Sequence, residues 1–240
     1  MSDEAEWELY YHDTKLAGVG RNEFAKLIFE EVGVKYKEVN DNMYELFRGD
    51  KWTGYPTFAP PMIKKGDFSL SQAGVISRYL GKQFGLYPDN EVDQWHAEQL
   101  SATVHDYLAE AYNPDSINFF TGRLAFHGVY PTDSYFSQQE GTQPYINRFV
   151  EKRFHQFLKH FEKALTYNNR GFMVGNKLTY IDLEVYHILR ATENQFPEAW
   201  RDLSTIPHLK AFKNRIEVRP NIATYLKSTR CNKFQGNSMM

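Results

Sequence analysis

Two consecutive prolines, Pro60 and Pro61, lie in a segment, FAPPMIKKGDFSLS (58–71), that otherwise predicts a β-hairpin. Proline has no N–H to donate to a sheet, and an X-Pro bond is the peptide bond for which the cis form costs least. Two explanations are open. The prolines could protect a sheet edge from further pairing, or they could shape the backbone of a binding site. We favour the binding site.

Other residue types exclude several kinds of catalysis. Cys231 is the single cysteine, so the chain has no C-x-x-C redox motif, cysteine cluster for zinc or intrachain disulfide. His155 and His160 are five residues apart and miss the shared face of a helix, and no H-x-x-x-H occurs. The glycine motifs of phosphate loops, dinucleotide sites and hydrolases are also absent. We therefore expect no metal and no nucleotide cofactor.

Composition limits the partners and the location. The formal charge of −2 lacks the basic surplus of a nucleic-acid-binding protein, and no block of like charge suggests a membrane surface. The N-terminus is acidic where a secretory signal would be basic and then apolar, and no run of 18 apolar residues occurs. We expect a cytoplasmic protein with neither nucleic acid nor membrane as partner.

The prolines belong to a predicted α/β region. Residues 6–11 predict a strand, and the apolar spacing that follows predicts a helix ending at Gly33. Residues 34–40 alternate as a second strand, and the stretch from 41 to 58 is polar and turn-rich. After the hairpin comes a helix for which Ser71 is the natural N-cap. This order predicts a small mixed sheet with helices on both sides.

From residue 91 to residue 227 the pattern becomes helical. The clearest helix covers 144–165, with one apolar stripe made of Ile146, Phe149, Val150, Phe154, Phe157, Leu158, Phe161 and Leu165. The aromatic segment 112–143 fits neither helix nor strand, and its loops could line a pocket. Thr179 and Asp182 predict a capping box at a helix start. The capping role accounts for Asp182, so the alternative role of a catalytic carboxylate is not needed to explain this residue.

Taken together, these elements resemble the cytosolic glutathione transferase superfamily, over nearly the whole chain. The resemblance is carried by the order of ELYYH, GRNEFAKLIFEEVG, FAPPMIKKGDFSLSQAGVISRYL, GNKLTYID and IPHLKAFKNRIEVRPNIATYL. The FAPP and SQ motifs and the STRCNKF tail are similar to a poorly characterised subgroup found in fungi and bacteria. The resemblance implies a thioredoxin-like α/β domain over residues 1–88 and an all-α domain over residues 91–240 that forms the hydrophobic electrophile site.

The resemblance also explains the prolines. In that superfamily a cis-proline at the start of a strand turns the preceding residue toward the active site, where its backbone pairs with the cysteinyl unit of glutathione. Here the cis residue would be Pro61, or Pro60 if the turn is one residue longer. If Pro61 is cis, the preceding residue is Pro60, which has a carbonyl but no N–H to donate.

Further glutathione contacts follow from the same resemblance. Gln72 and Ala73 begin the helix whose amides would hold the γ-glutamyl carboxylate. Ala73 lacks the hydroxyl that the family has at this position. Lys51 and Trp52, with Arg48 as a weaker candidate, lie where the family binds the glycyl carboxylate.

For catalysis, the family's L-x-Y motif selects Tyr11 as the donor of a hydrogen bond to the glutathione thiolate, with Tyr10 on the opposite face of the sheet. Thr14 is the reserve candidate, because serine-type members use a hydroxyl in this loop. Tyr112 and Phe119 are the candidates for binding the electrophile.

The function implied is a detoxification-type transferase that conjugates glutathione, its co-substrate, to small hydrophobic electrophiles without a cofactor. A homodimer is expected, with the helix around Trp95 to Tyr107 at its seam and Asp106 reaching the partner's glutathione. The alternative is a non-catalytic protein of the same fold that sequesters apolar ligands or binds partners.

Overall fold

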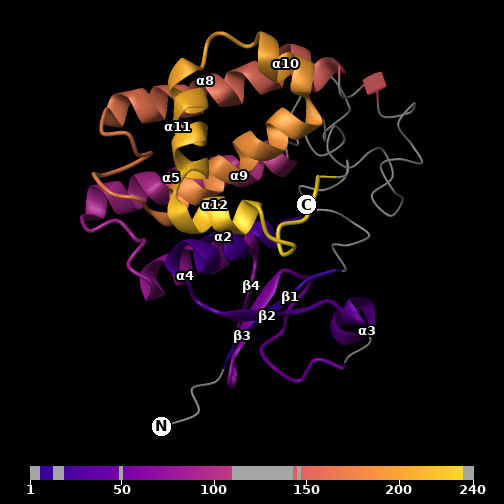
Figure 1. Ribbon diagram of the computed structural model, residues 1–240. Helices are drawn as coiled ribbons and strands as arrows, with labels where there is room; N and C mark the ends of the chain where they lie inside the picture. The colour runs from indigo at the N-terminus through magenta and orange to yellow at the C-terminus, as the bar shows by residue number, and fades with distance from the viewer. Residues whose placement is uncertain (1–5, 13–18, 49–50, 110–142, 145–146, 235–240) are drawn as a thin grey trace.

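The computed structural model describes residues 6–12, 19–48, 51–109, 143–144 and 147–234 (Figure 1). Its N-terminal part is a four-stranded mixed sheet with strand order β2-β1-β3-β4. Strand β1 runs parallel to β2 and antiparallel to β3, and β3 is antiparallel to β4. The elements are β1 (Trp7–Tyr10), α2 (Glu23–Val32), β2 (Tyr36–Val39), α3 (Met43–Arg48), β3 (Met62–Lys65), β4 (Phe68–Ser71) and α4 (Ala73–Gln83).

Helices cover the apolar face of this sheet. Trp7 and Leu9 of β1 are buried, and the Trp7 ring lies 5.7 Å from that of Phe29 in α2. Helix α4 packs on β3 and β4 and against α2. Gly33 ends α2 with a left-handed φ of 70°, a conformation that glycine adopts without steric cost, as the sequence predicts.

Two local predictions are wrong. The polar stretch after β2 contains a short helix, α3, because polar residues around Met43 and Leu46 still leave apolar side chains at helical spacing. Ser71 is not the N-cap of α4. It is the last residue of β4, where it pairs with Met62, and the cap position falls on Gln72.

The C-terminal part is helical, as predicted, and lies above the sheet with α2 and α4 between them (Figure 1). Helix α9 packs against α5, α10 and α11 of this part and against α2 and α4 of the other. The elements are α5 (Glu91–Ala109), the π-helical turn η2 (Phe149–Arg153), α8 (Phe154–Asn168), α9 (Tyr180–Gln195), α10 (Pro197–Asp202), α11 (Pro207–Glu217) and α12 (Pro220–Leu226). The predicted fold class is confirmed.

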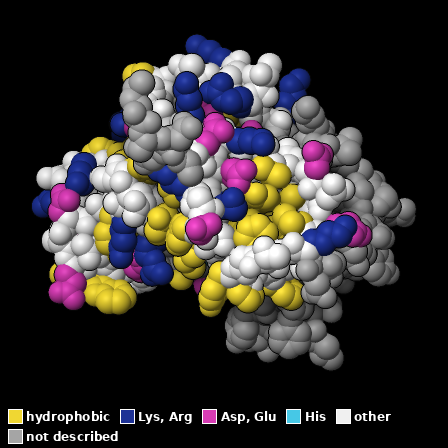
Figure 2. All heavy atoms as spheres, turned by 90° about the horizontal axis from the view of Figure 1, so that it is seen from below, with side chains coloured by type: hydrophobic (Ala, Val, Ile, Leu, Met, Phe, Trp, Pro, Cys, Tyr) yellow, Lys and Arg dark blue, Asp and Glu magenta, His cyan; other side chains and the backbone are white. Residues whose placement is uncertain are grey.

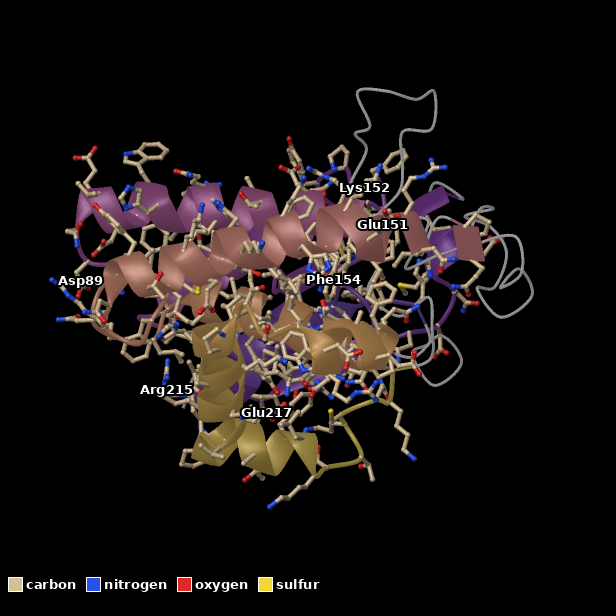
Figure 3. All side chains as sticks on the ribbon, turned by 90° about the horizontal axis from the view of Figure 1, so that it is seen from above. Asp89, Glu151, Lys152, Phe154, Arg215 and Glu217 are labelled. Carbon is tan, nitrogen blue, oxygen red and sulfur yellow. The ribbon has the colours of Figure 1, made fainter. Side chains whose placement is uncertain are left out.

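Within the helical part, the apolar stripe predicted from the sequence forms the core. Phe154 lies inside the helical layer, whereas Glu151 and Lys152 of the preceding turn are exposed (Figure 3). Among the described residues between 144 and 166 there is no strand, and of the stripe only Ile146 lies outside them. No helix in the described part of the chain combines the length and the apolar character needed to cross a bilayer.

The capping box at the start of α9 is confirmed. One oxygen of Asp182 accepts hydrogen bonds from the N–H and the hydroxyl of Thr179, over 2.7 and 2.9 Å, and the other accepts from the Met173 N–H over 2.7 Å. Burial raises the pKa of Asp182 to about 6, against the effect of these donors. The carboxyl group is therefore occupied by structural contacts.

Candidate functional site

One end of the sheet brings three of the predicted site residues into a row. Tyr10 pairs with Met62, and Met62 pairs with Ser71 across the neighbouring strand. The next residues in the same direction are Tyr11, Pro61 and Gln72. Because neighbouring strands are about 4.8 Å apart, the backbones of these three residues lie side by side although they are far apart in the sequence.

The middle position of the row is the cis-proline. The peptide bond between Pro60 and Pro61 is cis, which confirms Pro61 rather than Pro60 as the cis residue. The residue before it is therefore a proline, and it offers a ligand a carbonyl oxygen but no N–H.

Gln72 has an unusual backbone. Its φ of 75° and ψ of 110° lie outside the regions that non-glycine residues normally occupy. Such a conformation costs about 1–3 kcal/mol and is found where a ligand or the surrounding structure demands it. Helix α4 begins at the next residue, Ala73, so its first amides lie beside the row and can attract an anion.

Tyr11 follows β1 directly, and its N–H donates to the Val39 carbonyl over 3.1 Å. Its side chain is only 4% exposed, and its hydroxyl oxygen accepts the Arg21 N–H over 3.0 Å. Burial raises the pKa of Tyr11 to about 12, while this N–H acts in the opposite direction. The phenol therefore keeps its proton at neutral pH, as a hydrogen-bond donor must.

Gly20 and Arg21 are site residues that the sequence reasoning missed. A Cβ on Gly20 would fall 2.7 Å from Cζ of Tyr11, so only glycine lets the phenol approach this backbone. The pair of Gly20 and Arg21 can be noticed in the sequence, in the loop before α2. That Gly20 makes room for the Tyr11 phenol cannot be predicted from the sequence alone, because the position of Tyr11 is set by the sheet.

Tyr10 is separated from this environment, as strand alternation predicts. Its hydroxyl donates to Glu8 over 3.0 Å, and its ring lies 6.0 Å from that of Trp52. The Trp52 indole N–H donates to the Tyr55 carbonyl over 2.9 Å. Trp52 therefore approaches the strand on the side of Tyr10.

Lys51 has an ion-pair partner, Glu45, with 3.0 Å between Nζ and the carboxylate oxygen, and both side chains are more than half exposed. Thr14, Tyr112 and Phe119 lie outside the described residues, and so does the side chain of Arg48.

The described residues contain no group of three or more His, Cys, Asp or Glu side chains that could hold a metal ion.

Comparison with known proteins assigns the family. Residues 126–229 match the family model described as glutathione S-transferase, C-terminal domain. Glutathione S-transferase P 1 of Xenopus laevis is 30% identical over 89% of this chain and 90% of its own length. A glutathione S-transferase of Plasmodium falciparum is 28% identical, over 91% of this chain and 93% of its own length. The chain belongs to the glutathione S-transferase family.

Solved structures agree on the fold. A glutathione S-transferase from the hookworm Necator americanus, described as monomeric, superposes with a TM-score of 0.70 at 18% identity. The superposition covers 93% of this chain and 97% of the hookworm protein.

Proposed function

We infer that this chain is a glutathione transferase that conjugates the thiolate of glutathione to hydrophobic electrophiles, a detoxification-type activity. Family membership supports the inference, and the row of Tyr11, Pro61 and Gln72 is the observation that carries it. The alternative, a non-catalytic protein that sequesters ligands or binds partners, is not favoured, because the two relatives described above, which match most of the chain, are named glutathione S-transferases.

Tyr11 is the proposed catalytic residue, with Thr14 as reserve. A thiol with an ordinary pKa of about 8.5 is mostly protonated at neutral pH, and the thiolate is the nucleophile. A hydrogen bond from the neutral phenol stabilises the thiolate, and each pKa unit by which it lowers the thiol pKa corresponds to about 1.4 kcal/mol. The Arg21 N–H supports this role, because it holds the hydroxyl oxygen in place.

The remaining contacts anchor the peptide. The Pro60 carbonyl would accept the cysteinyl N–H, and Gln72 and Ala73 would bind the γ-glutamyl carboxylate at the start of α4. Lys51 and Trp52 are proposed for the glycyl carboxylate, although Lys51 must first leave Glu45 and the Trp52 indole N–H must leave the Tyr55 carbonyl. The missing N–H at Pro60 and the missing hydroxyl at Ala73 should each weaken binding by about 1 kcal/mol.

The electrophile would lie on the helical side of Tyr11. Tyr112 and Phe119 remain the proposed residues for that site. No cofactor is proposed besides glutathione as co-substrate. The cytoplasmic location and the kinship with a fungal and bacterial subgroup also remain proposals.

Titration of the protein with glutathione, followed by the ultraviolet absorbance of the thiolate, tests this function. The wild type should develop thiolate absorbance near neutral pH. Tyr11→Phe should bind glutathione but form the thiolate only at higher pH, with conjugation slowed about tenfold or more, while the Tyr10→Phe control should behave like the wild type. Absence of glutathione binding by the wild type would refute the proposal.

A homodimer is the proposed assembly. Exposed apolar side chains occur on three successive elements, β4, α4 and α5, namely Phe68, Val75, Val92 and Trp95. Figure 2, from the side of the sheet, shows apolar side chains gathered between scattered charges. Asp106 is exposed and could reach the glutathione of a partner subunit. Tyr107 is fully buried and forms a hydrogen bond with Thr192 over 2.9 Å, so Tyr107 cannot contribute to the dimer interface.

Light scattering at micromolar concentration tests the assembly. A mass near twice the 28.2 kDa of the chain is expected. A mass near 28.2 kDa would reject the dimer and the role of Asp106, and would make the chain like the hookworm protein described as monomeric.

A further inference from the structure

Glu184 of α9 is a buried carboxylate that the proposed chemistry does not use. Its side chain is 0% exposed, and neither oxygen has a hydrogen-bond partner among the described residues. Burying an unpaired carboxylate is costly, and an apolar side chain would avoid the cost. The single basic side chain that the described residues bring within 4 Å is His105 of α5, whose Nε2 lies 3.9 Å from Oε1.

His105 in turn lies against the start of α4. A Cβ added to Gly74 would fall 2.7 Å from Nε2 and 2.9 Å from Cδ2 of the imidazole, so the ring edge contacts the Gly74 backbone directly. Gly74 follows Ala73 and Gln72, the residues proposed to bind the γ-glutamyl carboxylate. A continuous line of contacts therefore runs from Glu184 through His105 to the proposed glutathione site.

Two side chains beside this line, His187 and Tyr180, are uncharged at neutral pH. Phe24 of α2 lies between the two imidazoles, with ring centroids 5.3 Å from His105 and 4.6 Å from His187. Burial lowers the pKa of His187 to about 4, so this second imidazole is neutral at neutral pH. Burial, Glu184 and Glu98 all raise the pKa of Tyr180, so its phenol stays protonated.

The strained residue Gln72 needs such support. It is the N-cap of α4 but makes no side-chain capping hydrogen bond, so nothing in its own side chain compensates for a φ of 75°. A conformation of this kind persists only where the surrounding structure enforces it. The imidazole packed on Gly74 supplies that support from the helical part of the protein.

We propose that Glu184 and His105 are positioning residues for the transferase: the buried carboxylate orients the imidazole, and the imidazole holds Gln72, Ala73 and Gly74 in the conformation that binds the γ-glutamyl carboxylate. The proposal rests on the proposed function. According to this proposal, Glu184 and His105 influence the affinity for glutathione and have little effect on the chemical step at Tyr11.

Glutathione affinity by calorimetry, and steady-state kinetics with 1-chloro-2,4-dinitrobenzene as electrophile, test the pair. Glu184→Leu and His105→Leu should each raise the Kd and the KM for glutathione about tenfold, with kcat within twofold of the wild type. Glu184→Gln should keep most of the affinity, because the amide preserves the shape of the side chain and leaves a polar oxygen beside the imidazole, in place of the carboxylate oxygen that lies 3.9 Å away. If the Glu184 carboxylate only stabilised the fold, Glu184→Leu would not raise the KM for glutathione while leaving kcat unchanged.

Glu162 offers a matched control. It is a buried glutamate of α8 that accepts the N–H groups of His208 and Leu209 at the start of α11. Glu162→Gln should lower thermal stability but leave the glutathione Kd of the folded protein unchanged. If Glu184→Leu does not fold, His105→Leu and Gly74→Ala test the proposal in its place. Gly74→Ala should weaken glutathione binding, because its Cβ displaces the imidazole.

Hydrogen exchange without ligand separates this inference from the proposed function. The Ile76 N–H, which donates to the Gln72 carbonyl over 2.9 Å, should exchange about tenfold faster in His105→Leu than in the wild type. If the wild type does not bind glutathione, the proposed function fails and this exchange rate alone decides the role of the pair. Unchanged exchange, or a Kd within twofold of wild type in both leucine variants, would overturn the proposal.

Discussion

The main-chain N–H of Arg21 donates a hydrogen bond to the hydroxyl oxygen of Tyr11, over 3.0 Å. One acceptor lone pair of the phenol oxygen is thereby used by the protein, and the phenol is oriented by a backbone group that cannot rotate away. A hydroxyl that accepts a hydrogen bond also becomes a stronger donor, because hydrogen bonds in a chain polarise one another. The contact thus links the start of α2 to the chemistry proposed for Tyr11.

Gly20→Ala should displace the Tyr11 hydroxyl. A Cβ at this position would fall 2.7 Å from Cζ of Tyr11, and the buried ring has little room to move. We expect kcat/KM to fall about tenfold or more, and the thiolate of bound glutathione to form at higher pH. Thiolate absorbance against pH is the measurement. An unchanged profile in a folded variant would show that Gly20 does not position the phenol.

Ala73→Ser should restore the hydroxyl that the resemblance leads us to expect at the γ-glutamyl carboxylate. A hydrogen bond to a charged group contributes about 1.5–3 kcal/mol, less where solvent competes, so we expect the KM for glutathione to fall about fivefold. Ala102→Ser, on the exposed face of α5, is the matched control. A KM for glutathione that rises or stays constant in Ala73→Ser would show that the γ-glutamyl carboxylate does not bind at this residue.

Asp182→Ala should destabilise the fold by about 3–5 kcal/mol, because it leaves the Thr179 and Met173 N–H groups buried without an acceptor. Thr179→Val removes the hydroxyl, which donates to the Asp182 carboxylate and accepts the Asp182 N–H, and should cost about 1 kcal/mol. Urea unfolding at neutral pH measures both. Equal losses in the two variants would contradict the view that the carboxylate is the main acceptor.

His187 should make the protein sensitive to acid. Burial lowers its pKa to about 4 in the folded state, whereas in the unfolded chain it has the ordinary value of 6.5. As pH falls below 6.5 the unfolded chain takes up a proton that the folded protein does not, so stability is complete above 6.5 and is lost toward pH 4. The loss amounts to about 3 kcal/mol at 1.36 kcal/mol per unit.

His187→Leu should remove that part of the acid dependence, as measured by urea unfolding at pH 7 and pH 5. The exposed His96 provides the control, since His96→Gln should follow the wild-type curve. A His187→Leu curve parallel to the wild type between these pH values would mean that the folded protein takes up a proton at His187 as readily as the unfolded chain does.

The sequence by itself determined the features that depend on neighbouring residues. The apolar stripe around Phe154, the end of α2 at Gly33 and the capping box of Thr179 and Asp182 were all predicted, because their interactions join residues within a few turns of one helix. The order of the four strands and of the helices α2 and α4 followed in the same way, but α3 was missed. The proline pair also marked the site, although either proline could have been cis.

The tertiary structure alone decided which of these groups meet. The register of β1, β3 and β4 brings Tyr11, Pro61 and Gln72 into one row, and the packing of α5 and α9 brings His105 and Glu184 beneath Gly74. Local spacing cannot predict such contacts, because they are set by strand pairing and helix packing between distant segments. The same tertiary demand places Gln72 in a backbone conformation that its own residue type disfavours, so the sequence wrongly indicated Ser71 as the cap.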